Sequence, residues 1–182
     1  GLETNPGFKI TAKMGLRLAV GVVYGDLVMR ILYATRPYEK VPGTCEKILD
    51  KWHDRIIDNI IHFNRKRYAE NLKGIVEDFD RVERTGEKKP KVGVVGEILV
   101  KYHPNANNDI VGIIESEGGE AVVLDLLDFF LYGMYSKKFN YEKLSGSYKQ
   151  MYVNKIGIAA VEWLRKPMRK ALRESVHFVE PS

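Results

Sequence analysis

The sequence predicts an α/β fold built on a Rossmann-like βαβ core with few parallel strands. Two apolar runs, at residues 92–95 and 121–124, have the length of short strands, and a helical pattern at residues 110–114 separates them. Long stretches with helical periodicity come before and after this unit. We therefore expect a substantial helical part ahead of the core and a long C-terminal helix behind it.

Three helices are expected in the N-terminal part, because apolar residues recur there at spacings of three and four. Their apolar stripes cover residues 16–31, 48–63 and 68–82, and Thr44 is the expected N-cap of the second helix. Glycines interrupt the first stripe: Gly15, Gly21 and Gly25. Each lowers helix propensity by about 1 kcal/mol relative to alanine. We therefore expect another backbone to pack closely there.

The charged turn at residues 85–90 is the clearest internal boundary. It divides the chain into a helical portion, residues 1–84, and an α/β portion, residues 85–182, which we expect to pack as one compact unit. Residues 92–95 show no polar alternation, so this strand is expected to be buried on both faces. The helix that begins near residue 126 is apolar nearly all round and is also expected to be buried.

The remaining elements are predicted by turn and helix signals. Asn107 or Asn108 is the expected cap of the helix at residues 110–114, and Gly118–Gly119 ends that helix. A polar loop is expected at residues 136–147. The last helix, residues 148–175, contains Pro167, which should kink or split it.

Only two strands are strongly indicated. Residues 9–11 and 176–179 raise the number to four at most. Since a two-stranded sheet is marginally stable, we expect either a piece of a longer polypeptide or a homodimer that completes the sheet.

Charge and cysteine content narrow the class of protein. The net charge of +5 comes from interleaved acidic and basic residues, so we expect no nucleic-acid binding. Cys45 is the only cysteine, which excludes an intrachain disulfide or a Cys-rich metal or iron–sulfur site built by this chain alone. The apolar segment at residues 16–32 is interrupted by Arg17, Asp26 and Arg30. We expect a cytoplasmic protein with no membrane span.

The loop at residues 96–109 holds most of the chemically capable side chains. It is longer than the usual βα connection, and ligands bind at the carboxyl ends of parallel strands. Lys101 suits a phosphate or carboxylate, Glu97 and His103 suit proton exchange, and the asparagines offer amide hydrogen bonds. The candidate ligand-binding residues are Gly96, Glu97, Lys101, His103, Asn105, Asn107 and Asn108. The alternative is that the asparagines and Pro104 only form a turn and a helix cap.

No motif names a reaction. GxGxxG, GxxxxGK[ST], HExxH and GxSxG are absent, and we assign no catalytic residue and no metal ligand. Asp125 and Asp128 follow the second strand and form either a carboxylate pair at the sheet edge or a cap of the next helix.

The segment KVGVVGEILVKYHPNANNDIVGIIESEGGEAVVLDLLDFFLYG resembles part of the large activase-related proteins of the 2-hydroxyacyl-CoA (2-hydroxyglutaryl-CoA) dehydratase family. The blocks HPNANN and DLLDFFLY carry the resemblance, and MRILYATRPYE and LRKPMRKAL extend it over nearly the whole chain. The chain is similar to an uncharacterised middle segment of those proteins. The resemblance implies an anaerobic parent system that uses ATP and [4Fe-4S] clusters, while this chain alone contains neither cofactor site.

These observations lead to one expected function and two alternatives. We expect a non-catalytic binding or scaffold domain that contacts neighbouring domains of its parent polypeptide, or an acyl-CoA through Lys101. The first alternative is a pure protein-interaction module. The second is a small enzyme that uses Glu97 and His103.

Overall fold

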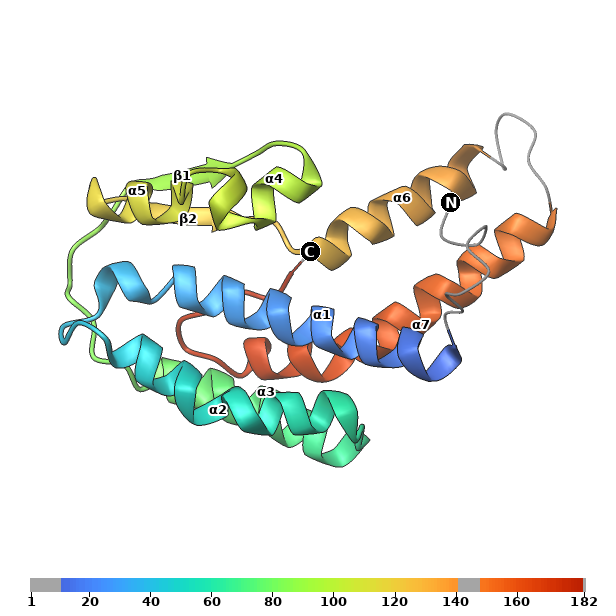
Figure 1. Ribbon diagram of the computed structural model, residues 1–182, viewed down its shortest axis with the longest axis horizontal. Helices are drawn as coiled ribbons and strands as arrows, with labels where there is room; N and C mark the ends of the chain where they lie inside the picture. Colours follow the sequence, from blue (N-terminus) through green and yellow to red (C-terminus); the bar gives the residue numbers. More distant parts are fainter. Residues whose placement is uncertain (1–10, 141–147, 182) are drawn as a thin grey trace.

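Helices make up most of the structure, and a two-stranded parallel sheet lies to one side of them (Figure 1). The computed structural model describes residues 11–140 and 148–181. The elements are α1 (Ala12–Tyr33), the short 3-10 helix η2 (Arg36–Tyr38), α2 (Thr44–Ile61), α3 (Arg65–Asp80), β1 (Lys91–Val94), α4 (Ile98–Tyr102), the 3-10 helix η3 (Pro104–Ala106), α5 (Ile110–Ser116), β2 (Glu120–Val123), α6 (Leu126–Asn140) and α7 (Tyr148–Arg173). This order confirms an α/β chain with a helical N-terminal part and a long C-terminal helix.

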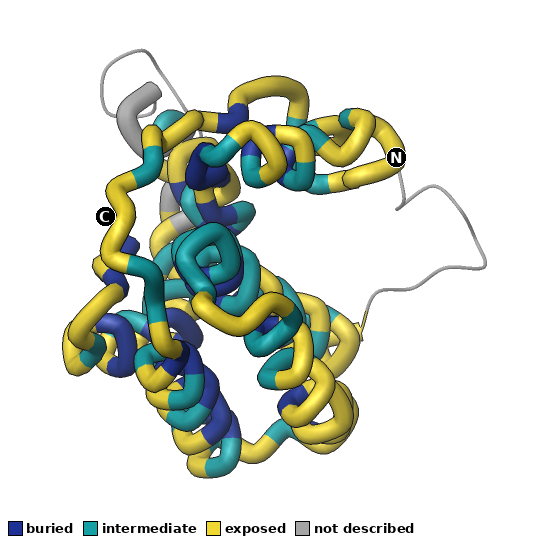
Figure 2. The backbone as a smooth tube through the Cα atoms, turned by 90° about the vertical axis from the view of Figure 1, so that its left-hand side faces the viewer, coloured by how far each residue is buried: buried dark blue, intermediate teal, exposed yellow. Residues whose placement is uncertain are grey.

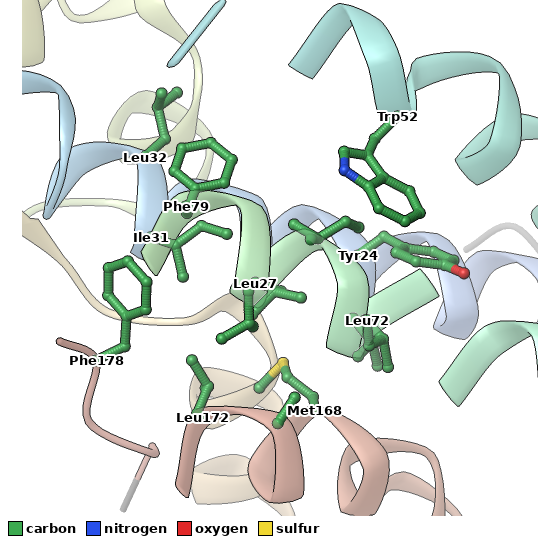
Figure 3. Close-up of a cluster of buried hydrophobic side chains, with 14 of the residues drawn as sticks. Tyr24, Leu27, Ile31, Leu32, Trp52, Leu72, Phe79, Met168, Leu172 and Phe178 are labelled. Atoms are coloured by element: carbon green, nitrogen blue, oxygen red, sulfur yellow. The ribbon is translucent and has the colours of Figure 1, made fainter. Parts of the chain in front are cut away.

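Helix α1 is the centre of the main core. Its stripe residues Val20, Val23, Leu27 and Ile31 are fully buried against α2, α3 and α7. Figure 3 shows side chains of these helices meeting around α1, among them Leu72 and Phe79 from α3 and Met168 and Leu172 from α7. Figure 2 shows that buried residues lie on the helix faces turned toward one another. The predicted stripes of the first three helices are confirmed, apart from Leu16 at the start of the first stripe, which is exposed.

The start of α2 differs from the prediction by one residue. Gly43, with φ of +84°, is the N-cap, and Thr44 is the first helical residue. The carboxylate of Glu39 accepts hydrogen bonds from the backbone N–H groups of Gly43 and Cys45, both at 2.9 Å. The Glu39 side chain, from outside the helix, therefore satisfies the free N–H group of Cys45 in the first turn of α2.

The predicted close packing at the α1 glycines is wrong. A Cβ at Gly15 or Gly25 would meet nothing within 4 Å, and one at Gly21 would make ordinary contact with Ile60. The closely packed glycine is Gly74 of α3, where a Cβ would come within 2.6 Å of the Trp52 ring of α2. The indole of Trp52 therefore fills the space that the missing side chain leaves.

The sheet consists of β1 and β2 with parallel pairing, and Val94 lies opposite Val123. A second hydrophobic cluster forms around it from Val94, Val111, Ile114, Ala121 and Val123. The expected burial of the first strand on both faces is wrong, because only Val94 of β1 is buried. Apolar composition predicted that the strand would be covered, but no described element covers its outer side.

Helix α6 is the other apolar element that is not buried as expected. Leu127 and Leu131 face the core, whereas Phe129, Phe130 and Tyr132 are exposed. The predicted polar loop begins too early, since α6 continues to Asn140, and residues 141–147 lie outside the described part.

The C-terminal region excludes one predicted alternative, a helix split at Pro167, and corrects one expectation, a strand at residues 176–179. Helix α7 runs through Pro167 without being split into two helices. Residues 176–179 form no strand, and Phe178 instead packs into the main core. The strand expected at residues 9–11 lies outside the described residues, apart from Thr11, whose side chain caps α1.

One segment, Ala12–Tyr38, is long and apolar enough to cross a membrane by length and composition alone. The core helix of a soluble protein meets the same criteria, and 44% of its most apolar window is buried inside this molecule.

Candidate binding site at the carboxyl ends of the strands

The carboxyl ends of β1 and β2 lie side by side because the strands are parallel and in register up to Val94 and Val123. The segment that follows β1 contains Gly96, α4 and η3 before α5 begins. Gly96 has a φ of +148°, a conformation that side chains rarely adopt, so a glycine is required at this turn. The predicted long loop thus contains two short helices, α4 and η3, beside the strand ends.

Glu97 serves as the N-cap of α4. Its carboxylate accepts hydrogen bonds from the N–H groups of Leu99 at 3.0 Å and Val100 at 3.3 Å. A negative charge at a helix N-terminus also interacts favourably with the helix dipole. No hydrogen bond joins Glu97 to His103 among the described residues.

Asn107 connects the two helices on either side of η3. Its Nδ2 donates to the carbonyl oxygens of Val100 and Lys101 at the end of α4, and its Oδ1 accepts from Ile110 N at the start of α5. Asn108 and Asp109 follow in left-handed conformations, with φ of 57° and 51°. Asp109 is the N-cap residue of α5, so the helix start is shared between Asn107 and Asp109.

The other candidate residues face solvent. Gly96, His103, Asn105 and Asn108 are exposed, and none of these side chains donates or accepts a hydrogen bond within the described part of the chain. Lys101 is half-buried, with Nζ 4.6 Å from the ring centroid of Tyr102. Tyr102 donates to the carbonyl oxygen of Leu124 at 2.6 Å, which fixes α4 against the end of β2.

Beneath this surface lies a buried ionic cluster formed by Asp26, Arg30, Asp125, Asp128 and Arg165. The carboxylate of Asp26 accepts the N–H groups of Leu126 and Leu127 at 2.8 and 2.9 Å, which caps α6 from α1. Arg30 donates to Asp125, and Arg165 donates to Asp128 at 2.6 Å. The cluster therefore joins α1, the end of β2, α6 and α7.

Burial without full charge compensation raises carboxyl pKa values in this cluster. The pKa of Asp26 is raised to about 6, mainly by desolvation, and the neighbouring Asp125 and Asp128 add to the shift. Desolvation also raises the pKa of Asp125, against the opposing effect of Arg30. The pKa of the Tyr102 hydroxyl is raised to about 12 by burial and by the same three carboxylates.

No family model, curated protein or solved structure matches this chain.

The described residues contain no group of three or more His, Cys, Asp or Glu side chains suited to a metal ion. Surface hollows among the described residues lie elsewhere; examples are one of about 610 Å³ along α7 and one of about 480 Å³ between α1 and the turn from α2 to α3.

Exposed apolar side chains surround the strand ends and form what we call the apolar collar. Its members are Leu99 and Val100 on α4, Leu124 after β2, and Phe129 and Phe130 on α6. Leu99 and Leu124 are 70% and 62% exposed, and both phenylalanines are about half exposed. The Tyr102 hydrogen bond to Leu124 holds α4 next to the β2–α6 junction, and Phe129 and Phe130 follow in the first two turns of α6.

Sequence reasoning identified the loop but missed three members of the ionic cluster. Asp26, Arg30 and Arg165 come from helices far from the loop in sequence. Asp26 directly precedes the stripe residue Leu27, and a charge beside a buried helix face is the signal that could have identified it. Asp125 and Asp128 were noticed, but their arginine partners were not.

Proposed function

We propose that this chain is a non-catalytic binding domain that docks a partner protein domain on the apolar collar. The observation that supports the proposal is the exposure of Leu99 and Leu124 at the strand ends and of Phe129 and Phe130 near the start of the next helix. A contiguous apolar surface at the strand ends is typical of an interaction site. Asp26 and the two arginines hold the start of α6, and the Tyr102 hydrogen bond to the carbonyl oxygen of Leu124 holds α4, so both helices are in place before a partner arrives.

We assign the parent system from the resemblance of the central segment to the 2-hydroxyacyl-CoA dehydratase and activase family. In that assignment the partners are neighbouring domains of an anaerobic, cytoplasmic system that uses ATP and [4Fe-4S] clusters. In this proposal the βαβ unit from β1 to β2 corresponds to one half of a Rossmann-like fold. This chain supplies a surface, and the neighbouring domains supply the chemistry.

The test is calorimetric titration of the chain with purified ATP-binding activase domains and with the dehydratase-like region. Leu99→Lys and Phe129→Lys place charges in the collar and should weaken binding at least tenfold. Val41→Lys is the matched control, since Val41 is 62% exposed and precedes α2. Failure of the wild type to bind either component, or equal binding by all variants, would overturn the proposal.

A second candidate function is the binding of acyl-CoA or another phosphate-bearing ligand beside the loop. Lys101 supports it, because no carboxylate within the described residues forms an ion pair with its Nζ, and His103 is exposed nearby. Titration with CoA and acyl-CoA, comparing the wild type with Lys101→Ala, tests this candidate. Equal or absent binding in both proteins would exclude it.

The enzymatic alternative has less support. A general base must be free to take a proton, whereas the carboxylate of Glu97 already accepts two backbone hydrogen bonds in α4.

A further inference from the structure

Strand β1 has one edge that no described strand covers. β2 pairs with the other edge, and Glu120 N donates to Pro90 O at 2.8 Å where the ladder begins. In a parallel ladder, alternate residues of a strand bond to the same neighbour. The N–H and C=O groups of Lys91, Gly93 and Val95 therefore point away from β2.

This edge is accessible and weakly protected. Figure 1 shows β1 at the outer margin of the molecule, with β2 between it and α1. Lys91, Val92 and Gly93 are exposed, Val95 is 87% exposed, and a Cβ at Gly93 would meet nothing within 4 Å. Proteins usually protect such edges with proline, bulges or charge. The single charge here, Lys91, is engaged by Glu120 at 3.1 Å.

We propose that a second copy of this chain pairs with this edge, so that two β1 strands run antiparallel about a two-fold axis at Gly93. The two sheets then become one four-stranded sheet, which removes the marginal stability of two strands alone. Gly93 lies at the middle of the outward residues with open space beside it, which favours a second copy because two glycines can meet at a two-fold axis without a side-chain clash. The proposal concerns the sheet edge and is independent of the docking proposed for the collar.

The register follows from the residues that point outward. An axis at Gly93 places Lys91 opposite the partner's Val95 and Gly93 opposite the partner's Gly93. All three outward residues then form hydrogen-bonded pairs, with about six inter-strand bonds in total. An axis at Val92 or Val94 would use only two such pairs. The preferred register also keeps the two Lys91 charges apart, and no side chains collide at the axis.

Cysteine cross-linking tests this register directly, because the native Cys45 is fully buried. Residues in a hydrogen-bonded antiparallel pair have Cα atoms about 5.5 Å apart, which a disulfide can span. Oxidation of Gly93→Cys should therefore give a covalent dimer. Lys91→Cys and Val95→Cys should each form no covalent dimer, because their own copies lie about 14 Å apart in the non-covalent dimer. A mixture of these two variants should cross-link.

Sedimentation of the uncross-linked proteins completes the test. The wild type should have twice its 20.8 kDa mass, and Gly93→Pro should be monomeric. Gly93 N–H points away from β2, so proline there removes only an outward donor, and circular dichroism checks that the helices persist. A monomeric wild type, or a dimer that Gly93→Pro leaves intact, would overturn the proposal. Leu99→Lys, in the collar, should leave the dimer unchanged.

Discussion

At the scale of residues, Asp26 joins α1 to the start of α6 through two backbone hydrogen bonds. Because its pKa is about 6 in the folded protein and 3.8 ordinarily, the folded state holds its proton more tightly than the unfolded state. The contribution of Asp26 to stability therefore falls as pH rises from about 4 to 6 and stays low above that range.

This linkage gives a measurable difference between the wild type and Asp26→Asn. As pH is lowered from 7 to 4, the stability of the wild type relative to Asp26→Asn should increase by up to about 3 kcal/mol. Urea unfolding at a series of pH values measures it. The other charged groups of the cluster, Arg30, Asp125, Asp128 and Arg165, are present in both proteins, which makes the comparison specific. A constant difference across the range would contradict the assignment.

Arg165 is the main cation of the buried cluster and is only 1% exposed. Replacing it with methionine leaves Asp128 without its 2.6 Å partner and removes a positive charge near Asp125. We expect Arg165→Met to lower the free energy of unfolding by about 3–5 kcal/mol. The adjacent and exposed Lys166→Met should change it by less than about 0.5 kcal/mol. Similar effects of the two substitutions in thermal unfolding would count against a compensated buried cluster.

At the scale of elements, glycines in two helices should respond oppositely to alanine. Gly74→Ala places a Cβ against the Trp52 ring, so α2 and α3 must separate, and we expect a loss of about 1–3 kcal/mol. Gly25→Ala in α1 meets open space and should stabilise the protein by up to about 1 kcal/mol. Denaturant unfolding of both variants checks the contrast. Destabilisation by Gly25→Ala as large as that by Gly74→Ala would contradict the packing described for α1.

The elements themselves were largely predictable, because spacings of three and four in the stripes specify which helix face is buried. The buried residues Val23, Leu27, Leu72 and Phe79 were all placed correctly. Packing partners across the core were not predictable. Periodicity shows on which side of a helix a glycine or tryptophan lies, but not which residue of another helix it contacts. This is why close packing was expected at Gly25 and is found at Gly74.

The candidate site, like the core, was predictable from the sequence only in part. The helix cap was predicted at Asn107 or Asn108, whereas the N-cap is Asp109, and Asn107 instead accepts a hydrogen bond from Ile110 N and donates to the end of α4. The buried cluster beneath could not be read from the sequence, because its members are separated by up to about 140 positions and meet only through the packing of α1 and α7.

At the scale of the molecule, apolar composition and burial disagree at β1 and α6. Both were expected to be buried, and both expose apolar groups where the structure offers no cover. The collar and the open edge of β1 are therefore separate surfaces, and the two proposals assign a different contact to each. The proposed function needs the first, and the proposed dimer needs the second.

Hydroxyl-radical footprinting of the chain, alone and mixed with the activase and dehydratase-like components, tests the docking of a partner on the collar most directly. Leu99, Phe129 and Phe130 should be labelled in the free chain and strongly protected in the complex. Trp163 on α7, which is half exposed, should be labelled equally in both. Unchanged labelling of the three collar residues in a complex that demonstrably forms would contradict the docking surface proposed for this domain.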